Sequence, residues 1–307
     1  MEDFAQRADP YRRELLTHCY RMVGSVQDAE DLVQETLLRG WRAYEQYDER
    51  RASLRTWLYR IATNVCLTAL RGRERRPLPS GLGLPDQDPW GPLRPGGDIP
   101  WLQPIPDDPA DVLAVRGDLR LAFVAALQFL PARQRAILIL RDVLDLPAKD
   151  VAETLQTTTT AVNSGLRRAR ERLAEMTIDQ LDEPAAQKER AEEYVRAFEA
   201  ADLDALTRLL TDDVILEMPP LLTWFRGRHA YTTFTQRAWT MRGTDWRMVA
   251  VGANGQPAAT AYVRAPHDDQ HRLHALHVFT IAPSGIARIS VFQQEPVFDA
   301  FALPRTI

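Results

Sequence analysis

The chain has 307 residues, of which 45% are hydrophobic and 26% are charged, a composition that is typical of globular proteins and excludes a disordered chain. Because one domain usually has about 100–200 residues, two or three folded units are expected. The formal net charge of −4 excludes an overall basic protein of the kind that coats nucleic acid non-specifically.

Two further features of the sequence exclude whole classes of protein. The N-terminus has no apolar segment behind a basic start, and no later stretch approaches the roughly 20 apolar residues of a membrane-spanning helix. Cys19 and Cys66 are the only cysteines, too few for a disulfide framework or a tetrahedral metal site. We therefore expect a cytoplasmic protein with no membrane span, no metal and no cofactor.

The first expected domain, residues 1–76, is a helical bundle. Apolar residues recur at helical spacing from Leu15 to Val23, and helices are predicted from Ala29 to about Glu45 and from Leu54 to Arg71. Eight arginines and a single acid lie between Arg50 and Arg76. This local basic stripe can bind phosphates although the whole chain is acidic.

Ten prolines follow within residues 77–109, together with several glycines. Such a composition disfavours helices and gives no regular apolar face from which a core could be built. Residues 77–110 are therefore predicted to form a linker.

Helical periodicity returns in the second expected domain, residues 111–178, which contains a helix-turn-helix pattern. One helix is predicted from Pro147 to Leu155 and a second after a turn at Gln156 and Thr157. Asparagine and arginine on the outer face of the second helix can bond to base edges and phosphates. An ordinary hairpin of helices with a solvated arginine face is the alternative. The outer face presents Asn163, Ser164, Arg167, Arg168 and Arg170.

The third expected domain, residues 185–307, changes from helical to alternating patterns. Two helices, at 185–201 and 203–210, precede five predicted strands. Helices before an antiparallel sheet indicate an α+β domain, so the whole chain is expected to combine two all-α domains with one α+β domain. The predicted strands are 214–218, 246–253, 256–264, 273–281 and 285–294.

Two segments of the first domain resemble region two of the extracytoplasmic-function (group IV) sigma factors of bacterial RNA polymerase. Asp28-Ala-Glu-Asp-Leu-Val-Gln-Glu-Thr is similar to the helix that docks on the clamp coiled coil of the polymerase β′ subunit, and Leu54-Arg-Thr-Trp-Leu-Tyr-Arg-Ile-Ala-Thr-Asn to the promoter-melting helix. The resemblance implies polymerase contacts by Asp28, Asp31, Leu32, Gln34 and Glu35. It implies recognition and melting of the −10 element by Tyr47, Arg50, Arg51, Arg55, Trp57, Tyr59, Arg60 and Asn64, which supply aromatic platforms and cations for separated strands.

The second domain resembles region four of the same family, from Leu130-Pro-Ala-Arg-Gln-Arg through Arg141-Asp142 to the helix-turn-helix. The resemblance implies contact with the β flap of the polymerase and a linker that passes toward the RNA exit channel. Gln156 departs from the family, which commonly has glycine in this turn, so a slightly different turn geometry and pose of the second helix are expected. Recognition of the −35 element is implied for Thr159, Thr160, Asn163, Ser164, Arg167, Arg168 and Arg170.

The third domain resembles the SnoaL-like, ketosteroid-isomerase-like cone, a curved sheet closed by helices around a pocket. The similarity rests on Tyr194-Val-Arg-Ala-Phe-Glu-Ala-Ala-Asp-Leu-Asp-Ala-Leu, the strand Asp213–Met218 and Phe225-Arg-Gly-Arg. Some sigma factors carry such a domain as a regulator, and an intramolecular contact with the sigma domains is the expected mode of control. The aromatic residues Trp224, Phe225, Phe234, Trp239 and Trp246 are expected in its core.

No catalytic site is predicted in this third domain, because no base can be paired with an oxyanion donor from sequence. Strand alternation places His274 on the opposite face from His271 and His277. The candidate bases are Glu217, His229, His267, His271, His274 and His277.

The sequence thus predicts a sigma factor that binds core RNA polymerase and promoter DNA, has no enzymatic activity, and is controlled by its third domain. Two alternatives belong to other classes. A free-standing helix-turn-helix repressor with a ligand-sensing domain would need no polymerase, and an enzyme of the cone fold would keep its turnover without residues 1–180.

Overall fold

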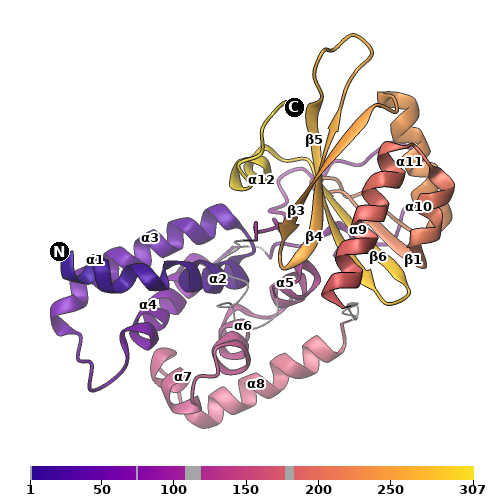
Figure 1. Ribbon diagram of the computed structural model, residues 1–307. Coiled ribbons are helices and arrows are strands. Elements are labelled where there is room, and N and C mark those ends of the chain that lie inside the picture. Colours follow the sequence, from indigo (N-terminus) through magenta and orange to yellow (C-terminus); the bar gives the residue numbers. More distant parts are fainter. Residues whose placement is uncertain (1, 74, 108–118, 177–182) are drawn as a thin grey trace. The chain divides into compact units, whose positions relative to one another are not determined.

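The chain forms two units whose boundaries do not follow the order of the sequence (Figure 1). The computed structural model describes residues 2–73, 75–107, 119–176 and 183–307. Unit 1 contains residues 1–76 and 108–177, and unit 2 contains residues 77–107 and 178–307. No helix in the described ranges combines the length and apolar character needed to cross a bilayer.

Capping residues determine where the helices of unit 1 begin and end. Gly24 adopts a left-handed conformation, with φ of 73°, and ends α2, while the Ser25 side chain accepts from the amide of Asp28 and begins α3. Ser53 caps α4 in the same way through the amide of Thr56. The first part of unit 1 comprises α1 (Glu2–Ala8), η1 (Asp9–Tyr11), α2 (Arg12–Val23), α3 (Val26–Ala43), η2 (Tyr44–Gln46) and α4 (Leu54–Ala69).

The second part of unit 1 packs on the first: α5 and α6 contact α2, while α6 and α7 contact α4. Arg135 of α6 is 4% exposed and donates to the carbonyl oxygen of Met22 in the last turn of α2, where the helix dipole favours a cation. It also donates to Oε1 of Gln128 over 2.7 Å. The elements are α5 (Leu121–Gln128), α6 (Ala132–Leu138), η4 (Ile139–Val143), α7 (Ala148–Thr154) and α8 (Thr159–Ala174).

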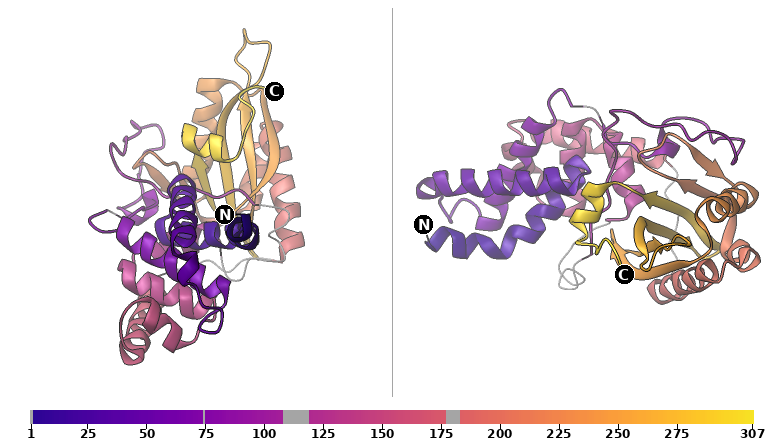
Figure 2. Two further views of the ribbon diagram at one scale, coloured as in Figure 1. Left: turned by 90° about the vertical axis from the view of Figure 1, so that its left-hand side faces the viewer. Right: turned by 90° about the horizontal axis from the view of Figure 1, so that it is seen from above.

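Unit 2 is built on a six-stranded sheet of order β2-β1-β6-β5-β4-β3, in which β1 and β6 are parallel and the other neighbours antiparallel. The sheet is curved, and α9 and α11 pack against it around an apolar core (Figure 2). The elements are α9 (Pro184–Glu199), α10 (Leu203–Leu209), β1 (Leu210–Glu217), β2 (Trp224–Arg226), α11 (Arg228–Arg242), β3 (Trp246–Ala253), β4 (Gln256–Val263), β5 (Arg272–Ala282), β6 (Gly285–Phe292) and α12 (Glu295–Ala300).

The expected fold class, two helical domains and an α+β domain, is confirmed. The sequence predicted neither α1 nor α12, and it indicated only a turn where β2 lies. Its three residues are too few for an alternating pattern, and it exists because Ile215 to Glu217 of β1 offer an edge to pair with.

The proline-rich segment differs from the prediction, because residues 77–107 belong to unit 2. The carboxylate of Glu217, fully buried, accepts from the Ser80 hydroxyl over 2.6 Å and from the Ser80 amide over 3.2 Å. Farther along, the Gly96 amide donates to the Pro220 carbonyl oxygen over 2.9 Å, and the Asp107 amide to that of Gly252 over 3.1 Å. The composition argument failed because a chain without helices can still pair its backbone with an existing surface. Residues 108–110 of the expected linker lie outside the described residues.

Candidate nucleic-acid interface

The helix-turn-helix is present, and its turn keeps the left-handed geometry of the family pattern despite Gln156. This residue adopts φ of +50°, the left-handed conformation that glycine would adopt without strain. The Thr158 side chain then accepts from the amide of Ala161 and begins α8. The departure from the family pattern therefore leaves the left-handed turn in place.

Helix α8 has a buried face and an outer face. Val162, Leu166 and Ala169 are buried, and Gly165 lets α8 approach α6, since a methyl group there would lie 2.7 Å from Cδ1 of Ile137. Of the residues assigned to the −35 element, Ser164 is half-buried and the others are exposed: Thr159, Thr160, Asn163, Arg167, Arg168 and Arg170.

Two of these arginines are paired with acids. Nη2 and Nε of Arg170 donate to the two carboxylate oxygens of Asp142 over 2.6 and 2.8 Å, and this pairing raises the pKa of Arg170. Arg167 lies 3.8 Å from Glu171, one helical turn farther on. Both pairs are exposed, where ion pairs contribute at most about 1 kcal/mol, so phosphates can displace the acids.

An aromatic row and three exposed arginines lie at the start of α4. Tyr47 stacks on Tyr44 with ring centroids 6.0 Å apart and contacts Trp57 at 5.0 Å. Arg50, Arg51 and Arg60 are exposed. This surface combines stacking platforms with cations, as single-stranded nucleic acid requires.

Two residues assigned to the −10 element do not belong to this surface. Tyr59 is 2% exposed and donates to Oε2 of Glu14 over 2.9 Å, and burial raises its pKa. Arg55 pairs with the same carboxylate at 2.6 Å. Because Tyr59 follows Arg55 by one helical turn, both side chains reach α2 and hold α4 against it, so in this structure both are engaged within unit 1.

Asn64 is exposed, but its side-chain amide is engaged within unit 1. It donates to the carbonyl oxygen of Arg60 over 2.9 Å and to that of Thr154, at the end of α7, over 3.3 Å. In this arrangement the residue assigned to base reading on α4 faces the helix-turn-helix.

The residues assigned to polymerase binding lie along α3. Asp31 and Gln34 are exposed, Leu32 is half-buried, and Glu35 pairs with Arg39 over 2.6 Å. Asp28 differs from these residues because its carboxylate is already paired. It accepts from Arg73 over 2.9 Å and from Arg76 over 2.8 Å, and these contacts join α3 to the chain after α4.

Sequence reasoning missed two apolar residues on the same helix. Leu38 is 38% and Trp41 45% exposed, and they continue the helical spacing of Asp31 and Gln34. Together with Phe4 of α1 and its neighbours they line a groove. Their spacing from Asp31 was the signal that could have identified them.

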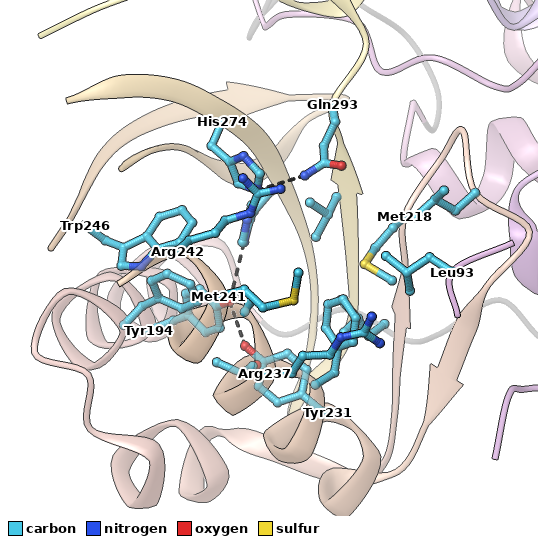
Figure 3. Close-up of a pocket in the computed structure, with 18 residues that line it drawn as sticks. Leu93, Tyr194, Met218, Tyr231, Arg237, Met241, Arg242, Trp246, His274 and Gln293 are labelled. Atoms are coloured by element: carbon cyan, nitrogen blue, oxygen red, sulfur yellow. Dashed lines mark hydrogen bonds between the residues drawn. The ribbon is translucent and has the colours of Figure 1, made fainter. Parts of the chain in front are cut away.

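Unit 2 contains a separate pocket, lined from α9, α11 and the sheet (Figure 3). His274 and His277 both line it, which contradicts the alternation expected along the strand. The register of β4 and β5 shifts between Ala261–Ala275 and Tyr262–Leu273, so His274 is a bulged residue and the alternation is interrupted there.

The other candidate bases lie elsewhere in unit 2. Glu217 points away from the pocket into its ion pair with Arg288 at 3.0 Å, and His271 pairs with Asp245 at 2.9 Å. His229 and His267 are exposed. Of the five aromatic residues expected in the core, Phe225, Trp239 and Trp246 belong to it, Phe234 packs against it, and Trp224 is buried; Phe234 and Trp246 also line the pocket. The described residues contain no cluster of side chains able to hold a metal.

Comparison with known families identifies three matches along the chain. Residues 8–76 match sigma-70 region 2, residues 120–173 match sigma-70 region 4, and residues 191–289 match a SnoaL-like domain. These matches fall in the first part of unit 1, its second part, and unit 2.

Two relatives of this chain come from Mycobacterium tuberculosis. The ECF RNA polymerase sigma factor SigG is 48% identical over 318 residues, covering 99% of this chain and 85% of the relative. SigJ is 31% identical over 205 residues, covering 66% of this chain and 61% of the relative. The crystal structure of SigJ has a TM-score of 0.69 at 22% identity, covering 96% of this chain and 98% of that one, and shows the same fold.

Proposed function

The chain belongs to the extracytoplasmic-function sigma factors of RNA polymerase, and we propose which of its residues perform the steps of promoter recognition. As a sigma factor it binds core polymerase and directs promoter-specific initiation of transcription, and the family is not an enzyme family. We place the chain in the cytoplasm, where the polymerase acts.

The outer face of α8 reads the −35 element in this proposal. The observation that carries it is the exposure of Asn163 and Arg168 on a helix whose other face is buried. A side chain that hydrogen-bonds to a base edge favours the correct base over a wrong one by about 1–3 kcal/mol. Holoenzyme carrying Asn163→Ala or Arg168→Ala should therefore select sequences from a random promoter library with relaxed preference at single −35 positions. Arg196→Ala, an exposed arginine of α9, is the matched control; equal selectivity in all variants would refute the assignment.

We assign −10 recognition to a smaller set than the sequence did. Tyr47 and Trp57 supply stacking platforms, Arg50, Arg51 and Arg60 hold phosphates, and Asn64 reads a base. Open-complex formation on a promoter that is already melted at −10 should be less sensitive to Trp57→Ala than on closed duplex. Equal loss on both templates would indicate that Trp57 acts only in packing.

The exposed face of α3 binds the clamp coiled coil of β′ in this proposal, with Asp31, Gln34 and Glu35 beside the apolar Leu38 and Trp41. We also propose that the second part of unit 1 contacts the β flap of the polymerase. Asp31→Arg together with Glu35→Arg should abolish binding to core polymerase in size exclusion, whereas Glu189→Arg together with Glu192→Arg, at exposed positions of α9, should not. Unchanged binding of the double variant would exclude this face.

Unit 1 must open before both promoter elements can be read. Asn64 donates to Thr154 and Arg135 ties α6 to the end of α2, so the −10 and −35 readers are held together. We propose that polymerase binding separates them. Distances between labels on α3 and α8 should lengthen when core polymerase is added, and an unchanged distance in active holoenzyme would refute opening.

The C-terminal domain modulates this opening by holding the segment between the two sigma regions. The family resemblance places residues 77–107 within the polymerase in the active state, whereas here they pack on unit 2 through Ser80 and Glu217. Retention of the segment would oppose transcription. Ser80→Ala removes a hydrogen bond to a buried carboxylate and should raise transcription in vitro. Ser290→Ala removes a matched bond to the same carboxylate, of 2.8 Å, from within the sheet, and should not.

A further inference from the structure

The pocket of unit 2 is an apolar cavity of about 140 Å³ that opens to solvent. Its apolar wall includes Phe198, Leu216, Met218 and Trp246. The exposed Met241 lies at its edge. A concave, mostly apolar cavity with a few convergent polar groups is the usual form of a site for a small molecule.

Three polar groups of the pocket, His274, Gln293 and Arg242, lie close together (Figure 3). His274 and Gln293 are joined by a hydrogen bond of 2.9 Å between their Nε2 atoms, and the Arg242 side chain lies beside them. Burial and the Arg242 charge lower the pKa of His274 to about 4, so its ring is neutral. Because the amide nitrogen of Gln293 can only donate, Nε2 of His274 is the acceptor, and the proton of the neutral ring is on Nδ1, where it can be donated to an acceptor.

The charges of the lining are all of one sign. Its described residues include Arg237 and Arg242 but no carboxylate. Deeper in the pocket, Tyr194 and Tyr231 join their hydroxyls over 2.7 Å, and burial lowers the pKa of His277 to about 3. A ligand with a negative group would therefore meet cations and neutral donors and no opposing acid.

We propose that this pocket binds a small aromatic carboxylate. Its ring lies against Trp246 and the apolar wall, and its carboxylate accepts from Arg242 and His274. A neutral analogue of the same shape keeps the apolar contacts and loses the charge-assisted hydrogen bonds, so the site discriminates by charge.

The proline-rich segment completes the site. Leu93 lines the pocket, and Nη1 of Arg237 donates to the carbonyl oxygens of Pro89 and Gly91 over 2.8 and 2.6 Å. A ligand that contacts Leu93 binds better while the segment is docked, and by linkage it stabilises docking. This step rests on the proposed function, in which the docked segment opposes transcription; ligand would then lower transcription.

Binding is tested first, on the full chain, with 2-naphthoate as the probe and 2-naphthamide as its neutral counterpart. Isothermal titration calorimetry should show the carboxylate binding at least tenfold more tightly than the amide. Arg242→Gln should remove that difference, and the exposed Arg247→Gln of β3 should preserve it. Equal affinities in the native chain, an unaltered difference in Arg242→Gln, or absence of binding at millimolar probe would overturn the proposal.

The coupling between ligand binding and docking of the proline-rich segment is tested by a separate measurement. Hydrogen exchange of residues 89–94 should slow when 2-naphthoate is added. Leu93→Ala should weaken binding of 2-naphthoate several-fold, while the preference for the carboxylate over the amide should still depend on Arg242. Slower exchange without an effect on transcription would refute the proposed regulation and leave the binding site intact. Binding without slower exchange would refute the coupling alone.

Discussion

Gly96→Ala gives the sharpest test of the docked segment, because glycine is required there by space. A methyl group at Gly96 would lie 2.6 Å from the carbonyl oxygen of Pro220 and 2.2 Å from Cζ2 of Trp101. The Pro220 oxygen also accepts the Gly96 amide, so the backbone cannot retreat without breaking that bond. Overpacking of this kind costs about 1–3 kcal/mol.

If the strain is relieved by release of the segment, the docking equilibrium shifts by roughly 5-fold to 150-fold, since about 1.4 kcal/mol corresponds to a factor of ten. Hydrogen exchange of residues 77–107 should accelerate by that factor, and transcription by reconstituted holoenzyme should rise. Gly83→Ala, in the same segment with open space around it, is the control. Faster exchange without higher transcription would refute the idea that docking opposes initiation, and unaltered exchange would refute the packing argument itself.

Three further predictions concern unit 1. Gln156→Gly should stabilise it by about 1 kcal/mol, because glycine accepts the left-handed turn without a steric penalty, and Gln156→Val should destabilise it; urea unfolding that ranks them otherwise would contradict the turn geometry. His18 is buried against Thr63 at 3.0 Å, and burial lowers its pKa to about 3, so the unfolded chain binds the extra proton and stability falls as pH drops below about 6.5. Between pH 7 and pH 5, protonation of His18 in the unfolded chain should lower the free energy of unfolding by about 2 kcal/mol. His18→Gln should remove that part of the pH dependence. Arg135→Met should cost about 1–3 kcal/mol by leaving the Gln128 side chain and the Met22 carbonyl without their donor, and should speed hydrogen exchange in α6; an equally stable variant would show that Arg135 does not hold the two halves together.

Local patterns in the sequence were enough to predict α2, α3, α4, α9, α10 and the helix-turn-helix. Ser25, Ser53 and Thr158 cap helices that the sequence placed close to their observed starts, and the buried face of α8 follows from helical periodicity. Exposure of Asn163 and Arg168 follows from the same periodicity. These features depend on residues within one or two turns of each other, which is why sequence alone could predict them.

Contacts between distant segments decided the rest. Arg55 and Tyr59 were assigned to DNA by residue type, but Glu14, more than forty positions away, holds both. His274 faces the pocket because a bulge in β5 breaks an alternation that the sequence presents as regular. Residues 77–107 look like a free linker because proline and glycine form no helix, yet their backbone amides and the Ser80 hydroxyl bond to a surface that exists only after unit 2 has folded. The sequence by itself therefore determined the family and the local elements, and only the tertiary structure decided which polar groups are already satisfied, because that depends on partners brought together by folding.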